Sequence, residues 1–108
     1  MLLEQLAVSN SASNSVTNRP QVQMYTTASC PYCIQAERLL TRKGVADITR
    51  VRVDLEPARR VEMMERTGRR TVPQIYIGEH HVGGFEELAA LERAGKLDPL
   101  LAGHTEAQ

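Results

Sequence analysis

Strand-like and helix-like patterns alternate along this chain, and their order limits the folds that are open to it. Runs in which apolar and polar residues alternate are typical of strands, whereas apolar residues repeating every three or four positions are typical of helices. The patterns, punctuated by Gly and Pro, predict the order β-α-β-α-β-β-α. The predicted elements are strand 21–26, helix 31–43, strand 49–55, helix 57–67, strand 73–77, strand 80–82 and a helix from about 85 to 94.

The order of elements predicts a particular sheet. The first β-α-β unit is expected to be parallel and right-handed, and the last two strands are too close in sequence for anything but an antiparallel hairpin. We therefore expect an α/β fold with a mixed four-stranded sheet, flanked on both faces by about three helices. A terminal turn is expected at Asp98-Pro99. The residues expected to face the core are Ile34, Ala36, Leu39, Leu40, Thr49, Val51, Val53, Leu55, Val61, Met64, Phe85, Leu88 and Leu91.

Length and charge restrict the function further. A chain of 108 residues allows one domain, expected over 20–102, with a disordered extension over 1–19 and a flexible tail over 103–108. Thirteen basic residues balance thirteen acidic ones, which argues against a dedicated nucleic-acid binder. No apolar run approaches the roughly 20 residues of a membrane-spanning helix. Glu4 and Gln5 interrupt the apolar start of the chain, so a cytoplasmic protein is expected rather than a secreted one. The protein is also expected to be a monomer.

The strongest chemical signal is Cys30-Pro31-Tyr32-Cys33, placed where a strand leads into a helix. A thiolate at a helix N-terminus has a lowered pKa, because backbone N–H groups and the helix dipole stabilise its negative charge. Pro31 suits the first helical turn, where its missing N–H has no acceptor. Cys33 follows three positions later on the same helix face and is expected to be the more buried thiol. The spacing thus indicates an exposed nucleophile, Cys30, and a resolving thiol, Cys33.

A zinc site is the structural alternative for the two cysteines, and it is disfavoured. Such a site needs four ligands. His80 and His81 are neighbours in a predicted strand, where they would point to opposite faces, and His104 lies in the tail. We therefore expect no metal site.

Three segments together resemble the dithiol glutaredoxins of the thioredoxin superfamily. They are the CPYC segment, Thr71-Val72-Pro73 with the strand that follows it, and Gly83-Gly84 with the helix that follows it. The resemblance covers about residues 21–101. It implies a thioredoxin-like fold and a glutathione-dependent oxidoreductase with glutathione as cosubstrate and no bound cofactor.

The resemblance also implies positions for glutathione. Thr71-Val72-Pro73 would contain a cis peptide bond, and the backbone of Val72 would pair with the cysteine moiety of glutathione. After Gly84, the N–H groups of Phe85 and Glu86 would bind the γ-glutamyl carboxylate, Glu87 would meet the ammonium group, and Tyr32 would wall the groove. Family members usually carry Asp-Asp where this chain has Glu86-Glu87, so the side chains here are longer.

One position departs from the family. Many glutaredoxins have a Lys three residues before the first cysteine, and this chain has Thr27 there. That Lys would help to bind the glycyl carboxylate of glutathione. Arg69 and Arg70 precede Thr71, and because Arg can bind a carboxylate through two hydrogen bonds, we expect one of them to replace the Lys.

The CPYC motif and the resemblance imply a reaction, and two other functions remain as alternatives. Reduced Cys30 would attack protein–glutathione mixed disulfides, and Cys33 would resolve mixed disulfides with proteins, so the expected partners are glutathione and disulfide-containing or glutathionylated proteins.

An iron–sulfur carrier would hold a cluster through Cys30 and glutathione, but carriers of this family usually have CGFS. A thioredoxin-like donor would take electrons from a flavoprotein reductase, but thioredoxins usually carry WCGPC, and this chain has no Trp.

Overall fold

The computed structural model describes residues 19–103, so the expected extension and tail lie almost wholly outside the described part. The elements follow the predicted order, with one further short helix at the end. They are β1 (Val22–Thr26), α2 (Pro31–Arg42), β2 (Ile48–Arg52), α3 (Pro57–Thr67), β3 (Gln74–Ile77), β4 (His80–Gly83), α4 (Phe85–Arg93) and α5 (Leu97–Leu101). No helix within this range is long and apolar enough to cross a membrane.

The four strands form one mixed sheet in the order β2-β1-β3-β4. β1 runs parallel to β2, with Val22 opposite Ile48, and antiparallel to β3, with Val22 opposite Ile77. β3 and β4 form the expected antiparallel hairpin. The sheet predicted from the sequence is confirmed, and because β1 is central, the segment that leaves its C-terminal end emerges in the middle of the sheet.

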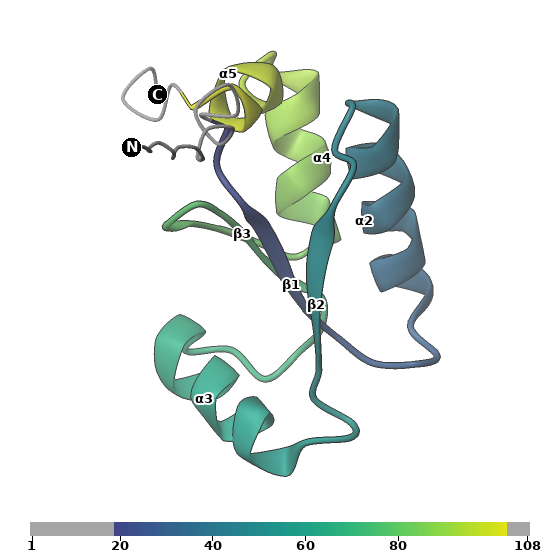
Figure 1. Ribbon diagram of the computed structural model, residues 1–108, viewed down its shortest axis with the longest axis vertical. Helices are drawn as coiled ribbons and strands as arrows, with labels where there is room; N and C mark the ends of the chain where they lie inside the picture. Colours follow the sequence, from purple (N-terminus) through teal and green to yellow (C-terminus); the bar gives the residue numbers. More distant parts are fainter. Residues whose placement is uncertain (1–18, 104–108) are drawn as a thin grey trace, which may run out of the picture.

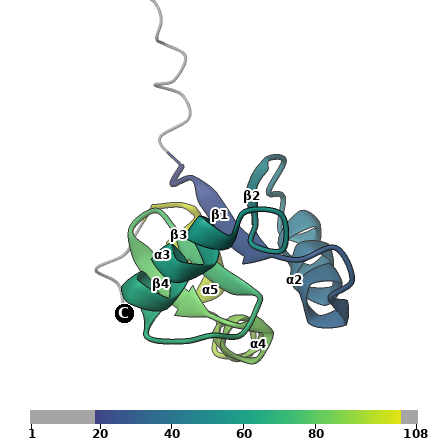
Figure 2. The same ribbon diagram turned by 90° about the horizontal axis from the view of Figure 1, so that it is seen from below.

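Helices cover both faces of the sheet, as predicted. α2, α4 and α5 lie on one face, and α3 lies alone on the other (Figures 1 and 2). The first face is packed by an apolar cluster that includes Met24, Leu40 and Leu88, each with no exposed surface. The second face holds a smaller cluster built around Tyr25 and Met63.

Four residues expected in the core are instead exposed to solvent: Ile34, Leu55 and Val61 are 49%, 67% and 48% exposed, and Thr49 on β2 is exposed as well. Ile34 follows Cys33, so it points about 100° away from the buried stripe of α2. Leu55 lies beyond β2, which ends at Arg52 rather than at residue 55, because the chain turns there with the N–H of Leu55 bonded to the carbonyl of Arg52.

The remaining differences concern α3 and the C-terminal end. Met63, not Met64, is the fully buried residue of α3, and Met64 packs only partly against the cluster. The expected turn at Asp98-Pro99 is part of α5, whose leucines join the larger cluster.

Candidate active site

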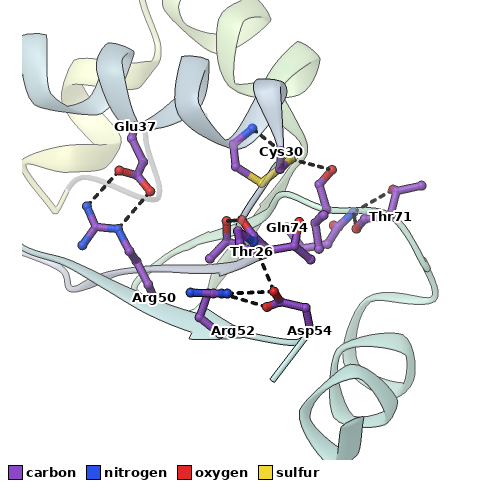
Figure 3. Close-up of a disulfide and its surroundings, with 12 residues drawn as sticks. Thr26, Cys30, Glu37, Arg50, Arg52, Asp54, Thr71 and Gln74 are labelled. Atoms are coloured by element: carbon purple, nitrogen blue, oxygen red, sulfur yellow. Dashed lines mark hydrogen bonds and ion pairs between the residues drawn. A yellow bond between two sulfur atoms is a disulfide. The ribbon is translucent and has the colours of Figure 1, made fainter. Parts of the chain in front are cut away.

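Cys30 caps the N-terminus of α2, at the point where the chain leaves the central strand. Its backbone is extended, Pro31 begins the helix, and the Cys30 Sγ accepts a hydrogen bond of 3.1 Å from the N–H of Cys33. The two cysteines form a disulfide, with their Cα atoms 5.1 Å apart (Figure 3). A sulfur in this position meets an N–H donor and the positive end of the helix dipole, which together stabilise a thiolate once the disulfide is reduced.

The two sulfurs differ in access, but less than expected. Cys33 is 2% exposed and Cys30 is 7% exposed. The expectation of an openly exposed Cys30 is therefore wrong for the disulfide form, because its sulfur is covered by Cys33 on one side and lies 3.8 Å from the carbonyl oxygen of Val72 on another. The small remaining exposure belongs mainly to Cys30, which is the order the CxxC spacing predicts.

A carboxylate beyond β2 holds the loop that leads to Cys30. Asp54 accepts two hydrogen bonds of 2.7 Å from Arg52 and one of 3.3 Å from the N–H of Ala28 (Figure 3). The Arg52 guanidinium is the main reason that the pKa of Asp54 falls to about 2, and the Ala28 N–H adds to it. The N–H of Val53 also bonds to the carbonyl of Thr26 at 3.0 Å. These contacts fasten the loop from two sides.

A groove of about 340 Å³ lies beside the disulfide. Nine of the ten residues expected to bind glutathione line it; the tenth, Arg70, does not. Tyr32 and Phe85 stack with their ring centroids 6.3 Å apart and form one wall. The Val72–Pro73 peptide bond is cis, as the family resemblance implies. The lining residues are Tyr32, Arg69, Thr71, Val72, Pro73, Gly84, Phe85, Glu86 and Glu87.

The first turn of α4 forms the other end of the groove. Glu87 accepts a hydrogen bond of 2.7 Å from the N–H of Gly84, and its second oxygen lies 3.4 Å from Arg69. The Gly84 N–H, followed by Arg69, lowers the pKa of Glu87. The first helical bond runs from Leu88 to Gly84, so the N–H groups of Phe85 and Glu86 have no acceptor within the helix.

Gly83 makes this turn possible. Its φ of +112° is a conformation that residues with a side chain rarely adopt, and a Cβ there would lie 3.0 Å from the Glu87 carboxylate. The two glycines therefore let the carboxylate fold back onto the start of its own helix.

Two further residues position the groove, and the motifs did not reveal them. Gln74 is fully buried and donates through Nε2 to the carbonyl oxygen of Thr71 at 3.0 Å (Figure 3). Its Oε1 lies 2.8 Å from Nε2 of His81, so His81 donates this bond through an Nε2–H. Burial is the main cause that lowers the pKa of His81, which favours the neutral ring. The only sequence signal was a Gln within an otherwise apolar strand.

The arrangement offers thiol–disulfide redox chemistry. Within residues 19–103, His, Cys, Asp and Glu nowhere gather in groups of three or more that suit a metal ion. The site combines a CxxC pair at a helix N-terminus with an adjacent groove, where the N–H groups of Phe85 and Glu86 have no acceptor within their helix.

Comparison with known proteins gives a consistent result. Residues 22–82 match the family model described as Glutaredoxin. A glutaredoxin of Pseudomonas aeruginosa is 58% identical over 83 residues, which is 77% of this chain and 98% of that protein. Glutaredoxin 3 of Escherichia coli K12 is 49% identical over 80 residues, covering 74% of this chain and 95% of that protein.

Solved structures agree with the sequence relatives. The solution structure of a glutaredoxin from Brucella melitensis superposes with a TM-score of 0.69 at 50% identity, covering 78% of this chain and 90% of that one. The crystal structure of a buckwheat glutaredoxin–glutathione complex superposes with a TM-score of 0.72 at 30% identity, covering 87% of this chain and 86% of that one.

Proposed function

The chain belongs to the glutaredoxin family of thiol–disulfide oxidoreductases, and from that premise we propose that glutathione is its electron donor. Its substrates in this proposal are protein–glutathione mixed disulfides and protein disulfides. The observation that carries the proposal is the groove beside Cys30, lined by nine of the ten residues expected to bind glutathione. The glutathione complex of the buckwheat relative supports the same ligand.

In the proposed reaction, the Cys30 thiolate attacks the glutathione sulfur of a mixed disulfide. The protein leaves as a thiol, and a Cys30–glutathione disulfide remains. The thiolate of a second glutathione then attacks the glutathione sulfur of that disulfide, which yields glutathione disulfide and frees Cys30. On a protein disulfide, Cys33 attacks the Cys30–protein bond instead, and the Cys30–Cys33 disulfide is left for glutathione to reduce.

The groove offers complementary groups for each part of glutathione. The N–H of Val72 bonds to no group within residues 19–103 and is available to the cysteine moiety. The N–H groups of Phe85 and Glu86, at the positive end of α4, suit the γ-glutamyl carboxylate. Because glutathione enters as a cosubstrate, the proposal includes no bound cofactor. It places a monomer in the cytoplasm, where glutathione keeps thiols reduced.

Of the two arginines offered as replacements for the missing Lys, Arg69 is the one we propose for the glycyl carboxylate. Arg69 lines the groove, whereas the backbone carbonyl of Arg70 accepts a hydrogen bond from Arg60 on α3, away from the groove lining. Arg69 is paired with Glu87 across the groove, and both side chains are close to half exposed, so the pair is weak. Glutathione binding then separates the pair, giving a carboxylate to Arg69 and an ammonium group to Glu87.

A comparison of electron donors tests the proposed function against the thioredoxin-like alternative. Turnover of a glutathionylated peptide is measured with glutathione plus glutathione reductase, and in parallel with thioredoxin reductase. We expect efficient turnover only with glutathione. Turnover with thioredoxin reductase alone would overturn the proposal. An absorption band in the visible range from protein purified without oxygen would instead favour the iron–sulfur carrier.

Matched arginine variants test the assignment of Arg69. Arg69→Gln should raise the KM for glutathionylated peptide by about tenfold, as expected for the loss of a hydrogen bond to a charged group, and Arg70→Gln should leave it near the parent value. Thr27→Lys should partly rescue Arg69→Gln. Equal effects of the two arginine variants would remove the assignment, while the donor comparison would still stand.

A further inference from the structure

A second hollow lies between α2 and α4, on the face of the sheet that carries the disulfide. Its volume is about 510 Å³. Residues of each helix line it at spacings of three and four, so the hollow follows the facing stripes of the two helices. Leu39, Phe85 and Ala89 are its apolar members. The full lining is Gln35, Arg38, Leu39, Arg42, Phe85, Ala89, Glu92 and Arg93.

The charges around this hollow are unbalanced. Arg38, Arg42 and Arg93 form no ion pair with any carboxylate within residues 19–103, whereas Arg50, Arg52, Arg59 and Arg69 each form one. The single acidic residue of the lining, Glu92, lies 3.1 Å from Lys43, which it shares with Asp98, so the lining keeps more positive than negative charge. Three arginines around the apolar side chains of Leu39, Phe85 and Ala89 are complementary to a peptide that carries carboxylates and some apolar surface.

The hollow shares one lining residue with the glutathione groove. Phe85 lines both, and it stacks on Tyr32 at the active site. α2 begins at the nucleophile and rises about 1.5 Å per residue, so Arg38 and Arg42 lie roughly 12 and 18 Å along the helix from Cys30. An extended peptide advances about 3.3 Å per residue and covers those distances in about four to six residues.

We propose that this hollow, lined by Arg38, Arg42 and Arg93, docks an acidic segment of the protein substrate. The segment lies about four to six residues from the substrate cysteine that reacts with Cys30. The carboxylates bind the arginines while the cysteine reaches the N-terminus of α2. Substrates with acidic residues at this spacing are therefore reduced faster than equivalent substrates without them.

The test uses peptides whose single cysteine is disulfide-bonded to thionitrobenzoate, and it needs no glutathione. The Cys30 thiolate of the reduced protein attacks the peptide sulfur, a Cys30–peptide disulfide forms, and thionitrobenzoate leaves as a coloured thiolate. Cys33 then displaces the peptide as a thiol and leaves the Cys30–Cys33 disulfide. Because no step involves glutathione, failure of this inference is distinguishable from failure of the proposed function.

Two peptide pairs define the measurement. One pair carries three Glu or three Gln residues at the fourth to sixth positions before the cysteine, and the other carries them at the same distance after it. The second-order rate constant is followed from thionitrobenzoate release at low ionic strength. In one of the two pairs we expect the Glu peptide to react about threefold to tenfold faster than its Gln partner, with the advantage reduced by salt.

Matched variants locate the effect. Arg38→Gln/Arg93→Gln removes one cation from each helix and should abolish the advantage of the Glu peptide, while the rate with the Gln peptide stays at the parent value. Arg59→Gln/Lys96→Gln removes the same charge from α3 and from the segment before α5, and should preserve the advantage. Equal rates for Glu and Gln peptides in both pairs would overturn the proposal, as would an advantage that survives in the Arg38/Arg93 variant.

Discussion

The face of the sheet covered by α2, α4 and α5 buries fourteen residues in one apolar cluster, whereas the face covered by α3 buries five. The smaller face makes up for this with polar contacts. The Tyr25 hydroxyl donates to Glu62 at 2.5 Å and accepts from Arg66 at 2.8 Å. The Arg66 guanidinium also lies 4.0 Å from the centre of the Tyr76 ring. Burial is the main cause that raises the pKa of Tyr25.

The candidate active site lies where the two faces of the sheet meet. Val72 packs against both clusters, and its carbonyl oxygen approaches Cys30. The proposed nucleophile, Cys30, comes from the apolar face, since Cys30 and Cys33 belong to the larger cluster. The segment that faces Cys30, which contains Thr71 and Val72, is held by Gln74, which bonds to the Thr71 carbonyl and to His81. His81 in turn stacks on Tyr76 of the smaller cluster. The comparison of the two faces indicates that apolar packing contributes most of the stability of the fold, while polar contacts fix the position of the groove.

The largest expected effect comes from opening the apolar face. Leu40→Ala removes a fully buried side chain from α2 and should lower the free energy of unfolding by about 2–5 kcal/mol. Ile34→Ala is the matched control on the same helix; because Ile34 is half exposed, its effect should stay within about 0.5 kcal/mol. Denaturant unfolding measures both, and comparable losses would contradict the outward position of Ile34.

The polar face should respond to the loss of one hydroxyl. Tyr25→Phe leaves Glu62 and Arg66 without their shared partner and should cost about 1–2 kcal/mol in unfolding free energy. Tyr76→Phe is the control, because the Tyr76 hydroxyl bonds to no side chain or backbone group within residues 19–103. If the two variants lost stability equally, the hydrogen bonds of Tyr25 would not hold this face together.

Gln74 connects the polar face to the groove, so its removal should act on substrate binding. Gln74→Leu leaves the Thr71 carbonyl and the His81 ring without partners. We expect the KM for glutathionylated peptide to rise about threefold to tenfold while kcat changes less than about twofold. His80→Gln, one position away on β4, should change neither. A fall in kcat at constant KM would assign Gln74 a role in the chemical step instead.

The smallest expected effect lies at Asp54, which joins the end of β2 to the loop before Cys30. Its folded-state pKa of about 2 lies below its ordinary value of 3.8, so its contribution to stability is present above pH 4 and is lost as the pH falls through about 2. The Tm of Asp54→Asn should therefore fall less steeply than that of the parent between pH 4 and 2. Asp47→Asn, an exposed control, should follow the parent curve; a parallel fall in both variants would exclude this contribution.

The order of elements and the two-faced sheet could be predicted because strand and helix periods are distinct in this chain. The wrong predictions of buried residues arose where the apolar residues of the sequence are not the residues that pack against the core. In α3, Met63 and Thr67 share a face with the long stems of Arg59 and Arg60, which count as polar in a sequence but cover apolar surface. Val61 lies on the other side of that helix and is exposed for this reason.

The residues of the candidate site could be predicted from sequence motifs, but the contacts that support those residues could not. The cysteines and both walls of the groove lie in short segments with fixed spacing, so the family resemblance locates them. The Gln74–His81 bond and the Asp54–Ala28 bond join residues 7 and 26 positions apart, and they depend on how β4 and β2 are placed in three dimensions. The pairing of Arg69 with Glu87, 18 positions apart, has the same origin.

The most direct test of the account is whether glutathione becomes attached to Cys30 and to no other residue. Reduced Cys33→Ser is mixed with glutathione disulfide, and the product is mapped by mass spectrometry; reduced Cys30→Ser is treated in the same way. The Cys30 thiolate should displace one glutathione and keep the other, giving one adduct per chain on Cys30, while the buried Cys33 of the second variant should remain a free thiol. An adduct on Cys33 in Cys30→Ser, or no adduct on Cys30 in Cys33→Ser, would contradict the account.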